Sequence, residues 1–318
     1  MGDLNNDTFY LAFKDANPSW SLIGCASIFG IIAVFGSIFN ASVIYVTIRT
    51  KSFRGTVNYL LALCSFFEFI HQPGYFLFVY TAFSGQNFIE YRLAVKITFI
   101  SWFGIAAISP TMFFTGIDRL IGIAFDEMHN KCKVRFYLTT ITVICITFGI
   151  DFLVTIYQFM NLCGDQMITG IITDFTKDTS RQRIMWHCLT IMTIVVYLFV
   201  GLFIKIKSSG LPSADQINRR TFRSLFCIIA VNIGGYFINL FYINLIKPSI
   251  SSPITAWFCQ VIAVIPLNIG AASNGPILYF TSTDYRQAFQ KQFPLVFKQI
   301  PNQNQVIPLQ QQNGHPCN

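Results

Sequence analysis

Charged residues are scarce in this sequence. Only 11% of its 318 residues are Asp, Glu, Lys or Arg, whereas a soluble domain carries roughly 25%. Hydrophobic residues make up 53% of the chain, and the mean hydropathy is +0.53. This balance excludes an ordinary water-soluble domain and predicts a protein whose main solvent is lipid.

Motifs for catalysis are missing as well. The chain has no His-Glu-x-x-His, no phosphate-binding glycine loop and no cluster of cysteines and histidines with metal-ligand spacing. We therefore expect no enzyme activity, no metal and no cofactor. The net charge of +8 is not gathered on a polar, solvated face, so nucleic-acid binding is not expected either.

Long polar linkers and internal repeats are absent too, which favours one folded unit. Residues 1–17 are polar and acidic without a short apolar core, so we expect the first apolar run to act as its own insertion signal. The expected organisation is an extracellular N-terminus over 1–19, a membrane domain over 20–280, an amphipathic interfacial helix over 281–294 and a disordered cytoplasmic tail over 295–318.

Apolar stretches long enough to cross a bilayer recur seven times. A helix needs about 20 apolar residues to cross a hydrocarbon core of roughly 30 Å. The predicted crossings are 20–48, 57–82, 94–124, 135–159, 186–207, 220–246 and 253–280. The expected fold class is an all-α membrane protein: a seven-transmembrane-helix bundle with a short amphipathic helix after the seventh span.

Lysine and arginine are unevenly divided between the two sides of these crossings. With the N-terminus outside, 15 of the 22 fall on the cytoplasmic side, as the positive-inside rule predicts. The acceptor sequence Asn6-Asp7-Thr8 then lies outside, where Asn6 would be glycosylated. We expect a multi-pass protein with an extracellular N-terminus and a cytoplasmic C-terminus.

Four short motifs lie in the first, second, third and seventh spans, each at a definite depth in the membrane. They are Asn40 with Val43, Asn58-Tyr59-Leu60-Leu61-Ala62-Leu63, Asp118-Arg119, and Asn274-Gly275-Pro276-Ile277-Leu278-Tyr279. This set resembles the rhodopsin-like G-protein-coupled receptors. More narrowly, Gly116-Ile117-Asp118-Arg119-Leu120-Ile121 and Tyr279-Phe280-Thr281-Ser282-Thr283-Asp284-Tyr285-Arg286 resemble the nematode serpentine chemoreceptors of class sx.

The resemblance covers nearly the whole chain and implies a function. It implies a chemosensory receptor of the plasma membrane, placed in sensory-neuron cilia, that binds an external small molecule and activates a heterotrimeric G protein. A neuropeptide receptor is the alternative within the same class, and a membrane transporter or channel is the alternative from another class. The outer charges are too mixed to select a peptide ligand, and the sequence carries no signal for the oligomeric state.

Roles at the cytoplasmic end also follow from the resemblance. Arg119 would be held by Asp118 at rest and would contact the G protein when the bundle opens, and Asn274, Pro276 and Tyr279 would belong to the same activation set. Taken from the residues alone, an Asp-Arg pair at a helix end is also consistent with an interfacial ion pair that merely anchors the helix.

A lone carboxylate, Glu68, lies well inside the second span, where it is costly unless it is protonated or paired. The resemblance implies a sodium-binding acid here, with Asn40 and Asn274 as partners. Three positions that would complete a sodium site lack oxygen-bearing side chains: Ile108, Gly270 and Ala271. We therefore expect a neutral or water-linked Glu68 that shares its proton with His71; a satisfied buried acid without a switching role is the alternative.

Residues expected to line a ligand pocket are aromatic or polar and lie in the third, fourth and sixth spans. They are Trp102, Phe103, Asp151, Asn232, Tyr236 and Asn239. The last three are spaced four and three residues apart and share one helix face, although core packing or an interhelical hydrogen-bond network would produce the same stripe. Asp151 would be a counter-charge for a cationic ligand, or would simply reach water.

Prolines within spans mark expected bends, because each removes a backbone hydrogen bond. They are Pro73, Pro110, Pro266 and Pro276. The sixth span has none, so Gly234-Gly235 is its candidate hinge.

A disulfide usually joins the third helix to the second external loop in rhodopsin-like receptors. The expected third-helix position here is Ala94, which leaves Cys163 without that partner. A bridge from Cys163 to Cys25, Cys188 or Cys259 stays open. We expect the second external loop to be looser than usual.

Overall fold

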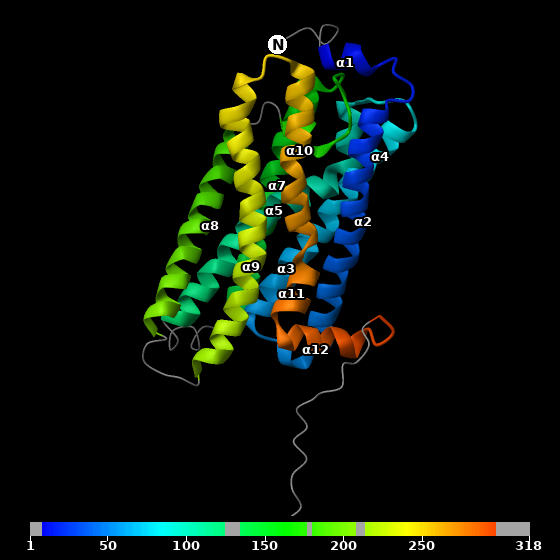
Figure 1. Ribbon diagram of the computed structural model, residues 1–318. Coiled ribbons are helices and arrows are strands. Elements are labelled where there is room, and N and C mark those ends of the chain that lie inside the picture. The colour runs from blue at the N-terminus through cyan, green and yellow to red at the C-terminus, as the bar shows by residue number, and fades with distance from the viewer. Residues whose placement is uncertain (1–7, 125–133, 177–179, 208–213, 297–318) are drawn as a thin grey trace, which may run out of the picture.

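The computed structural model describes residues 8–124, 134–176, 180–207 and 214–296. Long helices run side by side, with α1 (Thr8–Phe13) at one end of the bundle and α12 (Thr283–Gln292) across the other (Figure 1). We call these two ends of the bundle the α1 end and the α12 end. Asn6 and the predicted tail from residue 297 onward lie outside the described residues.

Six helices in the described part are long and apolar enough to cross a membrane. They begin or lie within α2 (Trp20–Arg49), α5 (Tyr91–Ala124), α7 (Val134–Cys163), α8 (Ser180–Lys207), α9 (Ala214–Phe241) and α10 (Pro253–Ala272). Their positions match the predicted first, third, fourth, fifth, sixth and seventh spans. The starts of α8 and α9 differ most, each falling 6 residues before the predicted start.

The second predicted span is the one crossing without a single long helix. It is divided into α3 (Thr56–His71), a 3-10 turn η3 (Gln72–Gly74) and α4 (Tyr75–Phe83). Pro73 lies in this turn, where its missing N–H removes a backbone hydrogen bond and its ring favours a kink or a break. With this crossing included, the all-α seven-helix membrane bundle is confirmed.

The other three intramembrane prolines act differently. The seventh crossing pauses at Ser273, three residues before Pro276, and resumes as α11 (Asn274–Thr281). In contrast, α5 and α10 continue as helices through Pro110 and Pro266. The helix is therefore interrupted at two of the four predicted bends.

The sixth crossing extends beyond α9 through a π-helical turn η5 (Tyr242–Ile246) and a 3-10 turn η6 (Lys247–Ser249). Helix α9 is continuous through Gly234 and Gly235. A Cβ on Gly235 would overlap the backbone of Leu267 in α10, whereas one on Gly234 would meet nothing within 4 Å. Gly235 thus permits close packing of two helices, while the hinge stays a prediction.

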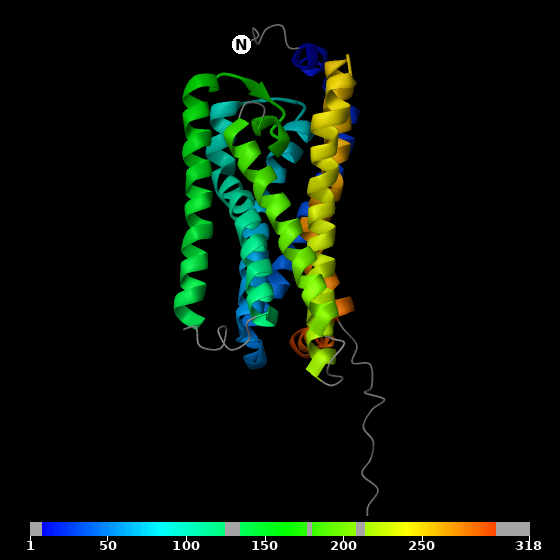
Figure 2. The same ribbon diagram turned by 90° about the vertical axis from the view of Figure 1, so that its left-hand side faces the viewer.

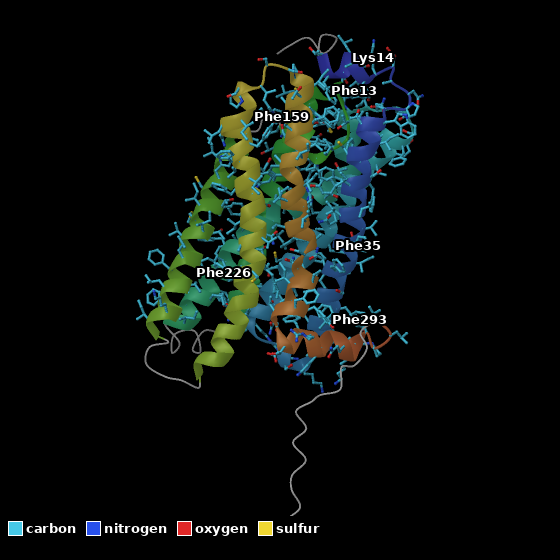
Figure 3. The ribbon with its side chains drawn as sticks, viewed as in Figure 1. Phe13, Lys14, Phe35, Phe159, Phe226 and Phe293 are labelled. Carbon is cyan, nitrogen blue, oxygen red and sulfur yellow. The ribbon has the colours of Figure 1, made fainter. Side chains whose placement is uncertain are left out.

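Helix α5 is the centre of the bundle. In its most apolar stretch 67% of the residues are buried, against 28% for α2, α7 and α8, which lie outside it (Figure 2). A Cβ on Gly104 would lie 2.7 Å from the Phe67 carbonyl oxygen, so α5 and α3 are in close contact. Outer helices carry exposed apolar side chains such as Phe35 and Phe226 (Figure 3), as a lipid-facing surface requires.

Short elements complete the fold near the helix ends. At the α1 end, β1 (Ile89–Glu90) and β2 (Met167–Ile168) form an antiparallel pair with Ile89 opposite Ile168. The 3-10 turn η4 (Ile172–Thr176) follows β2. At the α12 end, the 3-10 turn η2 (Lys51–Phe53) joins α2 to α3.

Candidate functional site

Helix α5 ends near a buried ion pair at the α12 end. Asp118 is 1% exposed, and its Oδ2 atom lies 3.6 Å from a guanidinium nitrogen of Arg119. The Thr56 hydroxyl, at the start of α3, donates to the same carboxylate oxygen at 3.1 Å. Thr56 therefore ties the pair to a second helix, and Arg119 is held along the helix surface.

A wide cleft opens beside this pair. It has a volume of about 1130 Å3 and is lined by η2, the start of α3, Arg119 and α12. Its described lining carries five basic residues, Arg49, Lys51, Arg54, Arg119 and Lys291, against one acidic residue, Asp284. We call it the α12-end cleft; it presents a concave basic surface. The side chains of three further arginines near the start of α9, Arg219, Arg220 and Arg223, lie outside the described part of the structure.

The amphipathic helix predicted over 281–294 forms as α12, and its apolar face packs on the bundle. The Tyr285 ring stacks on Phe53 at 4.4 Å, and its hydroxyl lies 3.1 Å from the Thr47 hydroxyl and 3.3 Å from Asn58 Oδ1. Burial raises the pKa of Tyr285 well above its ordinary range. The phenol therefore stays protonated and can donate a hydrogen bond.

Arg286 joins α12 to the end of α11. Its Nε atom donates to the carbonyl of Tyr279 at 3.0 Å, and one terminal nitrogen donates to the carbonyl of Phe280 at 2.8 Å. The last carbonyls of a helix have no partner within it, so Arg286 satisfies two of them. Pro276 and Tyr279, both predicted activation residues, lie in this short helix.

An amide network connects the first and seventh crossings in the middle of the bundle. Asn40 Nδ2 donates to the carbonyls of Gly36 and Ala271, each at 2.9 Å. Asn274 Nδ2 donates to Asn40 Oδ1 at 3.0 Å. Asn40 and Asn274 thus bond each other, and among the described residues neither is hydrogen-bonded to Glu68.

Glu68 is 2% exposed, and its Oε2 atom has no hydrogen-bond partner among the described residues. The His71 ring nitrogen Nδ1 lies 3.3 Å from the Ser101 carbonyl oxygen of α5, not from Glu68. The side-chain amide of Gln72, fully buried, is likewise without a partner in the described part. Glu68 and Gln72 are therefore two buried polar side chains in the interior of the bundle. The expected sharing of a proton between Glu68 and His71 stays a prediction.

Gly270 occupies a position that would need an oxygen-bearing side chain in a sodium site, and packing explains the glycine. A Cβ there would lie 3.1 Å from the Asn232 Cα atom of α9 and 3.3 Å from Asn232 Oδ1. Any larger residue would push α9 and α10 apart. Asn232 itself is 1% exposed and donates to the Ile228 carbonyl of its own helix at 2.9 Å.

A second cavity, of about 160 Å3, lies toward the α1 end between α5, α8, α9 and α10, with η4 contributing Ile172 and Thr173. We call it the α1-end cavity. Three of the six predicted ligand-binding residues line it: Trp102, Tyr236 and Asn239. They come from two helices and converge on one space, as the predicted pocket requires.

The other three predicted ligand-binding residues lie elsewhere. The Phe103 ring packs on α7, where a Cβ at Gly149 would lie 2.5 Å from ring carbons. Asn232 faces α10, as described above. Asp151 lies on α7, outside the described lining of the cavity. These three residues therefore do not line the cavity with Trp102. For Phe103 the reason is helix geometry, because adjacent residues of an α-helix point in directions about 100° apart.

The loop between α7 and α8 covers this end of the bundle through buried polar contacts. Asp174 is 7% exposed; its Oδ2 atom accepts from the Thr169 N–H at 3.0 Å and the Thr169 hydroxyl at 2.7 Å. Its Oδ1 atom accepts from Trp257 Nε1 of α10 at 3.0 Å. The cysteines in the described residues, Cys163 included, are free. The loop is thus tied by a carboxylate, so the expectation of a looser loop misses this anchor.

Helix α1 lies over the same end. The Phe9 ring is 4.6 Å from the Trp257 ring, and Asn87 Nδ2 donates to the carbonyls of Phe13 at 2.8 Å and Ala16 at 2.6 Å. The N-terminal segment, β1 region and loop therefore make one aromatic and hydrogen-bonded cover at the α1 end.

Several residues at these sites were not predicted from the sequence. Thr56 holds Asp118, Asp174 anchors the loop, and Lys247 with Gln260 lines the α1-end cavity, bonded to each other at 2.8 Å. Trp186 on α8 also lines it. The sequence does show Lys247 as the cation at the end of the sixth span. The direction of its side chain, however, depends on the turns η5 and η6.

Comparisons with known proteins agree with this arrangement. The fold is similar to the crystal structure of squid rhodopsin, with a TM-score of 0.66 over 87% of each chain at 14% identity, a likeness of fold alone. A comparison with curated proteins gives no match. A family model described as serpentine type 7TM GPCR chemoreceptor Srsx matches residues 33–293. Since that match spans most of the chain, the protein belongs to the Srsx family of serpentine seven-transmembrane chemoreceptors.

Proposed function

We propose that this receptor binds an external small molecule in the α1-end cavity and activates a heterotrimeric G protein at the α12 end. One observation carries the proposal: α5 lines the cavity with Trp102 and ends near the Asp118–Arg119 pair. A ligand that binds better to a state with separated helix ends at the α12-end cleft would shift an existing equilibrium toward that state.

The size of the α1-end cavity favours a small molecule over a neuropeptide. Its volume of about 160 Å3 is close to the roughly 150 Å3 that accommodates benzene in an apolar cavity. A peptide would have to displace the loop that Asp174 anchors to Thr169 and Trp257. The neuropeptide alternative is therefore the weaker one.

Orientation is proposed from the distribution of basic residues. Described cations concentrate at the α12 end, around the α12-end cleft, which supports a cytoplasmic α12 end and an extracellular N-terminus. The receptor would then lie in the plasma membrane of sensory-neuron cilia, with a glycan on the extracellular residue Asn6. A glycosidase-sensitive mass shift that disappears in Asn6→Gln would support this orientation, and an unglycosylated wild type at the cell surface would weaken it.

Guanine-nucleotide exchange on a panel of G proteins tests the coupling. Arg119→Ala should abolish exchange while surface expression is retained. Arg92→Ala is the matched control, because Arg92 is half exposed and pairs with the exposed Asp165 at 3.4 Å at the opposite end. Exchange that does not need Arg119 would contradict the proposed surface. A surface-localised receptor without any exchange would redirect the work to solute flux and ion current, the readouts of a transporter or a channel.

A further inference from the structure

The chemistry of the α1-end cavity narrows the ligand class, an inference that rests on the proposed function. Most of its wall is apolar or aromatic, including Ile105, Leu240, Val264 and the rings of Trp102 and Trp186. Such a wall binds a compact apolar body and leaves orientation to a few polar groups.

None of the described residues lining this cavity carries a carboxylate. Three described acids of the bundle lie outside this lining: Asp174, which accepts from Thr169 and Trp257, and Glu68 and Asp151. A cationic amine buried here would lack an ion-pair partner in that lining, and burying an unpaired charge is strongly unfavourable. The cavity therefore disfavours ammonium ligands.

Three side chains of the described lining can only donate hydrogen bonds, and none can only accept them. The indole nitrogens of Trp102 and Trp186 are buried without an acceptor in the described part of the chain, and an indole N–H can only donate. Lys247 lines the same cavity, where its ammonium donates to Gln260 Oε1 at 2.8 Å. The hydroxyl and amide groups of the lining can both donate and accept, so the groups with a fixed role all favour a ligand that accepts.

We infer that the α1-end cavity selects a small monocarboxylate, with the apolar body against the aromatic wall and the carboxylate toward Lys247 and the indole N–H groups. A carboxylate offers only acceptors when ionised, and charge-assisted bonds to a cation are the stronger kind. The two buried indole donors would gain the acceptor that they lack.

Three probes of nearly equal size separate the charge classes: benzoate, benzaldehyde and benzylamine. Direct binding is measured on the purified full-length receptor in lipid nanodiscs, by ligand-induced thermal stabilisation at equal concentrations. Benzoate should stabilise the receptor most, benzaldehyde less and benzylamine not at all. Lys247→Gln should weaken benzoate binding about tenfold or more and leave benzaldehyde within about twofold.

Trp102→Phe and Trp186→Phe keep each ring and remove one donor, so each should weaken benzoate binding about fivefold. Lys96→Gln is the matched control, because Lys96 is an exposed cation of α5 outside the described cavity lining; it should leave binding unchanged. Stabilisation by benzylamine equal to that by benzoate, no stabilisation by any probe, or benzoate binding that is indifferent to all three cavity variants would overturn the inference.

The binding assay needs no G protein, so its outcome is separable from that of the proposed function. Amine-selective binding together with Arg119-dependent exchange would remove the carboxylate class and leave the receptor function. Carboxylate-selective binding without exchange would do the reverse.

Discussion

The two ends of the bundle hold their key side chains in different ways. At the α12 end, Asp118 and Arg119 are neighbours in the sequence, and Thr56 donates a hydrogen bond to the Asp118 carboxylate. At the α1 end, Asp174 bonds Trp257, 83 residues further along the chain. A short motif therefore identifies the first site, whereas the second exists only once loop and helices have assembled.

Asp174→Ala should have the largest effect and would break the α1 end. It leaves the Thr169 N–H, the Thr169 hydroxyl and the Trp257 N–H without their acceptor, at a cost of roughly 2–4 kcal/mol. Thermal unfolding and hydrogen exchange of residues 164–176 measure it. Asp165→Ala is the control: Asp165 is 91% exposed, so its ion pair contributes less than about 0.5 kcal/mol. Equal losses in both variants would refute the anchor.

Thr56→Val tests the α12 end, where one hydrogen bond to a buried carboxylate is removed. Such a bond contributes about 1.5 kcal/mol. If it stabilises the resting state alone, basal nucleotide exchange should rise about tenfold. Thr140→Val, on an exposed face of α7 where the hydroxyl bonds its own helix at Phe136, should leave basal exchange unchanged. Identical basal exchange in wild type and Thr56→Val would show that this bond does not restrain Arg119.

Tyr285→Phe sharpens the comparison by loosening α12 alone. Loss of the hydroxyl contacts with Thr47 and Asn58 should cost about 1 kcal/mol, seen as faster hydrogen exchange in α12 with the α1 end unaffected. Tyr157→Phe, at a 59% exposed site, is the control.

The raised pKa of Tyr285 also gives a pH dependence. An unfolded tyrosine ionises near its ordinary pKa of about 10, while the buried phenol stays protonated, so stability should fall as pH rises above about 10. Tyr285→Phe should lose that part of the alkaline sensitivity. An unchanged alkaline profile would show that Tyr285 is exposed in solution.

Glu68→Gln should have the smallest effect if Glu68 is neutral, as we expect, because an amide would then replace a carboxyl of the same shape at the centre between the two ends. We expect a change below about 0.5 kcal/mol in unfolding free energy, and no difference between sodium and an organic cation in wild-type thermal stability. Sodium-dependent stability that disappears in Glu68→Gln would contradict a neutral Glu68.

Hydropathy was enough to predict the seven crossings, because a membrane helix must satisfy its own backbone groups within one continuous segment. Helical spacing placed Asn232, Tyr236 and Asn239 on one face; Tyr236 and Asn239 share one cavity lining, whereas Asn232 packs against Gly270 of α10. Phe103 follows Trp102 in sequence but turns onto Gly149 of α7. Asp174 and Lys247 could not be selected, because their partners, Trp257 and Gln260, are set by the assembled helices and not by local pattern.

The short turn η3 has a consequence for the second crossing. A 3-10 residue advances about 120° around the axis instead of about 100°, so Gln72–Gly74 adds roughly 60° of rotation between α3 and α4. A single helical wheel drawn through 57–82 is therefore out of phase beyond Pro73, where Tyr75 and Phe78 turn inward at 2% and 0% exposure. An insertion or deletion within this turn would rotate α4 relative to the α1 end of the bundle. Thr56, at the start of α3, would keep its hydrogen bond to Asp118.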